Sequence, residues 1–78
     1  MSHVPHELAE EFPDQVQQLH DLKMSNTHFQ NLANEYHEVN REIHRIESGV
    51  EGASELRERD LRKRRMSLKD EIARMMVN

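Results

Sequence analysis

Histidine is the residue type in this sequence with the clearest capacity for metal chemistry, because imidazole is a common ligand of zinc. The chain has six histidines, and His37 and His44 are seven residues apart in a predicted helix. That spacing corresponds to about 10.5 Å along the helix axis, too far for two ligands of one ion. His37 and Glu38 are not followed by the second histidine of an H-E-x-x-H zinc motif. We therefore interpret the histidines as solvent-exposed polar residues and expect no metal site.

Carboxylate pairs, which serve as general acids and bases in many enzymes, occur along the whole chain. Three of them are Glu10 with Asp14, Glu35 with Glu38, and Asp70 with Glu71. Catalysis also needs a concave pocket that excludes water and shifts the pKa of its carboxylates. A helical hairpin offers no such pocket, and the sequence has neither a nucleophile beside a base nor a glycine-rich phosphate loop. We expect a non-enzymatic protein without catalytic residues, cofactor-binding residues or a small-molecule substrate.

The strongest charged feature is a basic run, Arg62, Lys63, Arg64 and Arg65. Such residues can neutralise nucleic-acid phosphates. In a helix, however, consecutive residues point about 100° apart, so the run wraps around the helix instead of forming one stripe. Acidic residues are interspersed and no base-stacking aromatic lies nearby. A nucleic-acid or ribosome accessory factor using this basic helix is therefore the alternative function, ranked below a structural or protein–protein interaction module.

Two stripes of apolar residues predict the helices that position these side chains. The first stripe has alternating spacings of three and four and consists of Phe29, Leu32, Tyr36, Val39, Ile43, Ile46 and Val50. The second stripe keeps the same spacing, with Arg65 at one position, and consists of Leu61, Leu68, Ile72 and Met75. Narrow stripes of this kind are typical of helices that pack as in coiled coils. We predict an all-α fold: an antiparallel two-helix coiled-coil hairpin preceded by one or two short N-terminal helices.

Capping residues set the predicted ends of the helices. Asn26 and Ser54 are suited to cap the two long helices at their N-termini. Gly49 can end the first helix, and Gly52 can supply a positive backbone angle in the turn. The predicted division is a helical N-terminal segment at 1–25 and a hairpin at 26–78, with a helix at 27–48, a turn at 49–53 and a helix at 55–76.

The N-terminal segment carries apolar residues at helical spacing, out of phase with the later stripe. Pro13 interrupts them, and we expect Pro5 and Pro13 each to lie in the first turn of a short helix. The apolar face of this segment is predicted to cover the open end of the hairpin, over Phe29, Ile72 and the two C-terminal methionines.

Pairing the two stripes around the turn fixes a register for the hairpin. It places Ile43 by Leu61, Val39 by Arg65, Tyr36 by Leu68, Leu32 by Ile72, and Phe29 by Met75. Arg65 is expected to lay its aliphatic stem along Val39 and to carry its guanidinium to solvent or to an acidic neighbour. Glu47 and Arg57 are expected to face each other near the turn.

Composition predicts a thin core and a surface available to partners. The 78 residues are 35% hydrophobic and 33% charged, without cysteine, which suits one small domain in the cytoplasm. No apolar stretch is long enough for a membrane span. Domains of this size gain stability from partners, so we expect a protein partner or self-association. The predicted partner surface consists of Leu56, Met66, Met76, Arg62, Lys63 and Arg64.

The charge is distributed unevenly along the chain. Residues 1–48 contain three basic and nine acidic residues, whereas 49–78 contain eight basic and six acidic ones. This asymmetry favours pairing of the two halves and opposes self-association through like faces.

Two segments of the chain form a recognisable pattern. They are FPDQVQQLHDLKMSNTHFQNLANEYHEVNREIHRIE and LRKRRMSLKDEIARMM, which together cover about Phe12 to Met76. The motif at the end of the second segment contains Lys69, Asp70 and Glu71. Together the two segments resemble the YdcH-like family of short bacterial proteins. Thr27 departs from the proline that some members are expected to carry after the cap. The resemblance implies a helical hairpin and a bacterial, cytoplasmic setting, and it implies no activity.

Overall fold

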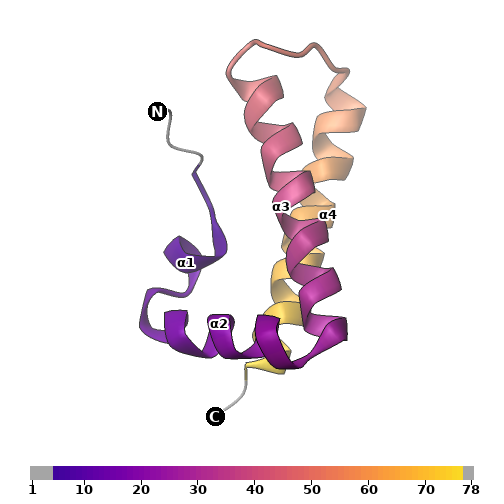
Figure 1. Ribbon diagram of the computed structural model, residues 1–78. Helices are drawn as coiled ribbons and strands as arrows, with labels where there is room; N and C mark the ends of the chain where they lie inside the picture. The colour runs from indigo at the N-terminus through magenta and orange to yellow at the C-terminus, as the bar shows by residue number, and fades with distance from the viewer. Residues whose placement is uncertain (1–4, 77–78) are drawn as a thin grey trace.

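The described part of the chain is a helical hairpin with a short helical segment packed on it (Figure 1). The computed structural model describes residues 5–76 and contains no strand in that range. Its elements are α1 at Leu8–Glu11, the 3-10 helix η1 at Pro13–Gln15, α2 at Val16–Ser25, α3 at Thr27–Glu47 and α4 at Glu55–Met75. The predicted all-α hairpin is confirmed, because the described residues form helices without a strand and α3 packs against α4. Within residues 5–76, no helix has the length and hydropathy needed to cross a membrane.

Both long helices begin at the capping residues expected for them. The side chain of Asn26 accepts a hydrogen bond from the backbone N–H of Phe29 at 3.0 Å. Ser54 Oγ accepts one from the backbone N–H of Arg57 at 3.2 Å. These bonds satisfy backbone donors of the first helical turn that have no partner within the helix.

The turn between the long helices reverses at its first glycine. Gly49 has a φ of 83°, whereas Gly52, expected to adopt a positive backbone angle, does not. The prediction for Gly52 is wrong because the helix end is already closed before it. The backbone N–H groups of Val50 and Glu51 both donate to the carbonyl of Arg45, at 3.0 and 3.1 Å. Only the residue at the reversal therefore needs the left-handed conformation.

Pro13 lies in the first turn of a short helix as predicted, whereas Pro5 does not. Pro13 opens η1, as expected for a residue without a backbone N–H. Pro5 lies before α1, which begins only at Leu8, so its predicted place in a first helical turn is wrong. The chain turns at His6, where φ is 65°, and the carbonyl of Pro5 accepts a hydrogen bond from the side chain of Asn40. A tertiary contact with α3 thus decides the conformation here.

The core is narrow and lies between α3, α4 and the N-terminal segment. The most deeply buried apolar residues are Leu8, Leu19, Phe29, Leu32, Ala33, Tyr36, Ile43, Leu68, Ile72 and Met76. Val39, Ile46, Leu61 and Met75 are half-buried at the edges of the stripe. Val50, included in the predicted stripe, is exposed because it follows the helix-ending Gly49.

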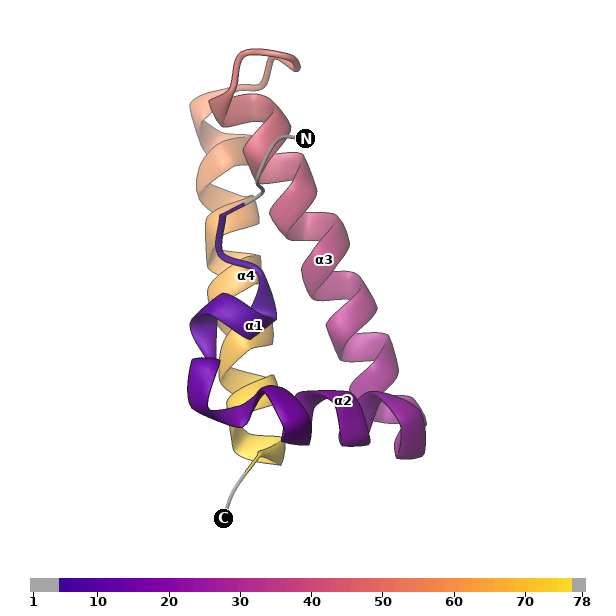
Figure 2. The ribbon, with the colours of Figure 1, turned by 60° about the vertical axis from the view of Figure 1, so that its left-hand side comes forward.

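The N-terminal segment runs along the side of the hairpin and then crosses its open end. Figures 1 and 2 show α2 lying across the base formed by the start of α3 and the end of α4. Leu8 and Leu19 from this segment join the core cluster, and Phe12 and Leu22 pack against it. Met76 is buried in the same cluster, so its assignment to an exposed partner surface is wrong. The cause is the cover provided by residues that precede the hairpin.

Two leucines of α4 provide a matched test of this core. Leu68 is fully buried, whereas Leu56 is 64% exposed. We expect Leu68→Ala to lower the free energy of unfolding by about 2–5 kcal/mol, through lost burial and the cavity left behind. Leu56→Ala should change it by less than about 0.5 kcal/mol. Urea denaturation followed by circular dichroism measures both, and equal effects of the two substitutions would contradict the packing described here.

Candidate functional site

Three arginines of α4 form ion pairs with glutamates of α3, on both sides of the apolar stripe. On one side Arg57 pairs with Glu42, and Arg64 pairs with Glu35. On the other side Arg62 Nη2 lies 2.8 Å from Glu47 Oε2. The prediction that Glu47 faces Arg57 is wrong, because side chains beside the stripe reach diagonally to partners five residues from the position opposite. Pairs on both sides keep the two helices in one register.

These contacts engage most of the basic run. Arg62 and Arg64 bind carboxylates of α3, and Arg65 binds an amide of the same helix. Lys63 alone in the run points away from α3 and has no ion-pair partner within residues 5–76. The run therefore serves mainly the packing of α4 on α3.

Asn40 is a buried polar residue to which no function was assigned from the sequence. It is 1% exposed, and its Oδ1 accepts a hydrogen bond from Arg65 Nη1 at 2.9 Å. Its Nδ2 donates to the carbonyl of Pro5 at 2.8 Å. The guanidinium of Arg65 was expected to reach solvent or an acidic side chain, but it binds the amide of Asn40 instead. Asn40 lies one heptad after Ala33, on the side of α3 that the N-terminal segment covers. Asn40 is buried because of this cover.

The N-terminal segment is attached to this side by further polar contacts. The hydroxyl of Tyr36 donates to the carbonyl of His6 at 2.6 Å, and burial raises the pKa of Tyr36 to about 12. His37 Nδ1 lies 2.8 Å from Glu7 Oε2, at an angle that does not form a hydrogen bond. His37 and His44 are both half-buried, so their predicted exposure to solvent is wrong.

The family-motif residues contribute one of these attachments. Lys69 Nζ lies 2.6 Å from Glu11 Oε1, and it stands 5.9 Å from the ring centroid of Phe12. The hydrogen bond and charge of Lys69 lower the pKa of Glu11 below its usual value. Asp70 is exposed on the outside of α4, and Glu71 is half-buried. The motif therefore faces both the N-terminal segment and solvent.

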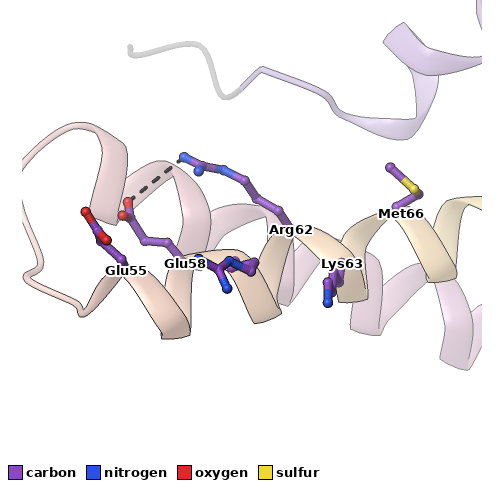
Figure 3. A pocket seen from close by; sticks show the side chains of 6 residues that line it. Glu55, Glu58, Arg62, Lys63 and Met66 are labelled. Atoms are coloured by element: carbon purple, nitrogen blue, oxygen red, sulfur yellow. Dashed lines mark ion pairs between the residues drawn. The ribbon is translucent and has the colours of Figure 1, made fainter.

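The outer face of α4, which points away from α3, is left open. We define it by Leu56, Arg59, Lys63, Met66, Asp70 and Ala73, all of them exposed. A shallow open groove runs along part of this face, as Figure 3 shows, and Arg62 reaches past it toward Glu58. Leu56 and Met66 are 64% and 66% exposed, although both are large and apolar. Within residues 5–76, no group of three or more potential ligands is arranged to hold a metal ion.

Removing the buried amide should destabilise the protein. We expect Asn40→Ala to lower the free energy of unfolding by about 1–3 kcal/mol, because Arg65 and the carbonyl of Pro5 lose their partner in a buried place. The exposed Asn34 of α3 gives the control, since Asn34→Ala should change it by less than about 0.5 kcal/mol. Adding Arg65→Met to Asn40→Leu should recover the part of the loss that comes from the unpaired guanidinium, while the carbonyl of Pro5 stays without its donor. Additive losses in the double variant, measured by urea denaturation, would contradict this account.

The contact between Glu11 and Lys69 should make stability depend on pH. Because folding lowers the pKa of Glu11 from 4.5, its contribution is fully present above that pH and is lost as the pH falls through the folded-state pKa. Glu11→Gln should therefore lower the melting temperature near neutral pH, and the difference from the wild type should shrink in acid. Thermal denaturation between about pH 3 and pH 7 measures this. The exposed Glu38 provides the control, because Glu38→Gln should keep the wild-type pH profile.

Comparison with known proteins gives one family. Residues 29–76 match the family described as "Protein of unknown function (DUF465)". The match covers more than half of the chain and includes α4 and nearly all of α3. Comparisons with curated proteins and with solved structures give no significant match. The chain thus belongs to the DUF465 family of proteins of unknown function.

Proposed function

We propose that this protein is a non-enzymatic helical-hairpin module that binds protein surfaces through the outer face of α4. The observation that carries the proposal is the exposure of Leu56 and Met66 on a helix whose other apolar residues are mostly covered. Methionine adapts readily to different surfaces, and exposed apolar side chains on a folded rod are suited to contacts with a partner.

The distribution of polar residues supports a binding role over a catalytic one. Carboxylates of α3 that could act as acids or bases, such as Glu35, Glu42 and Glu47, are bound to arginines of α4. The grooves on α4 are open to solvent, and Tyr36 is held as a hydrogen-bond donor inside the core. These groups maintain the hairpin and its register.

The alternative, a nucleic-acid or ribosome accessory factor, has weaker support. Arg62 and Arg64 are neutralised by α3, and Arg65 binds Asn40, which leaves Arg59, Lys63 and Arg74 as the cations of α4 whose side chains have neither an ion pair nor a hydrogen bond within residues 5–76. Asp60 and Asp70 lie exposed among them. This mixed surface lacks the continuous positive charge that phosphate backbones require.

The YdcH-like assignment and a bacterial, cytoplasmic setting are part of the same proposal. Their support is the resemblance of the two hairpin segments, over a region that overlaps the DUF465 match. The class of partner, another protein or a second copy of this chain, is inferred only from the outer face of α4.

A photo-crosslinking amino acid placed at Lys63 tests the proposal in native cells. We expect protein adducts at this position and few at Glu38, an exposed control position on α3. Adding Leu56→Asp and Met66→Asp should remove the adducts without changing the circular dichroism spectrum. Adducts that disappear on ribonuclease treatment, or an absence of adducts at Lys63, would refute the proposal. Ribonuclease-sensitive adducts would instead support the nucleic-acid alternative.

A further inference from the structure

We infer that the outer face of α4 binds the same face of a second copy, with the two α4 helices antiparallel. The inference rests on the proposed function and names its partner. It depends on the order of residues along this face and on which of their charges lack partners.

The residues of the outer face form a second stripe along α4. Their spacings alternate three and four through Leu56, Arg59, Lys63, Met66, Asp70 and Ala73. Residues with this spacing lie along one side of a helix and meet a partner helix as a seam. The structure leaves all six residues of the stripe exposed, and Met66 also borders a pocket lined by His6 and Glu11 of the N-terminal segment.

This stripe is complementary to itself when reversed. With a twofold axis between Lys63 and Met66, Arg59 of one copy lies opposite Asp70 of the other, and Leu56 lies opposite Ala73. Lys63 lies opposite Met66, so its aliphatic stem can cover the exposed thioether while its charge remains in solvent. A twofold axis repeats every contact, which gives two Arg59–Asp70 pairs in one interface.

The charges needed for these pairs are available. The side chains of Arg59 and Asp70 take part in no ion pair or hydrogen bond within residues 5–76. The same holds for Glu55 and Arg74, which come opposite each other at the ends of the stripe. Docking a second copy thus forms ion pairs without breaking those that join α3 and α4.

The uneven charge of the two halves of the chain opposes self-association through faces of like charge. The outer face of α4 avoids this repulsion because its charges are mixed. The exposed cations Arg59, Lys63 and Arg74 stand beside the exposed acids Glu55 and Asp70, so the face carries both signs. Exposed ion pairs are individually weak, and they set the direction and register of the pairing more than its affinity. The affinity comes from burying Leu56 and Met66, and the product is a four-helix assembly of two hairpins.

Sedimentation velocity of the full chain over a concentration series tests this inference by charge exchange. We expect a reversible dimer whose dissociation constant rises by about tenfold or more in Arg59→Asp and in Asp70→Arg, because each places like charges opposite each other twice. Combining both substitutions in one chain restores opposite charges and should return the constant close to the wild-type value. Arg41→Asp, at an exposed cation of α3, should leave it unchanged.

Three results would overturn the inference. They are a monomer at every concentration, a dimer unaffected by the single substitutions, and a double variant that is not restored although its circular dichroism spectrum is native. The photo-crosslinking experiment at Lys63 separates this inference from the proposed function. Adducts with a different protein would keep the binding role of the face and exclude the second copy as its partner.

Discussion

The narrow apolar seam between α3 and α4 is the contact on which the rest of the structure depends. Phe29, Tyr36, Leu68 and Ile72 are almost completely buried there, and few other side chains of the hairpin are. Because a two-helix stripe buries little surface, the hairpin also needs cover from the N-terminal segment and alignment by charges beside the stripe. That segment lies outside the part of the chain that matches the DUF465 family, so the cover is built by residues beyond the matched hairpin.

The need to align α3 and α4 beside their narrow seam also determines which charged side chains are free to contact a partner. Glutamates of α3 hold Arg57, Arg62 and Arg64 against the hairpin, so a basic run that suggests nucleic-acid binding serves helix packing. On the outer face of α4, Leu56 and Met66 remain exposed among charges of both signs. We propose that this surface binds protein, and the order of its residues along the helix is the basis for proposing a second copy of the chain as the partner.

Polar contacts also give the N-terminal segment a defined position. Asn40 joins the two parts of the protein, because it binds Arg65 of α4 and the carbonyl of Pro5 at once. A buried amide that needs both partners disfavours arrangements in which either is displaced. Lys69 and Glu11 add a contact of opposite charges farther along the same side.

Local patterns in the sequence determined the helices, their caps and the seam. Apolar spacing identified α3 and α4, and Asn26 and Ser54 marked their starts, because helical periodicity and capping act over a few residues. Only the tertiary structure decided the burial of Asn40 and Met76, since both are covered by a segment distant in the chain. It also decided which glutamates of α3 are bound by Arg57, Arg62 and Arg64. Long side chains reach diagonally between helices, so their pairing follows from the three-dimensional arrangement of the helices and not from the order of residues.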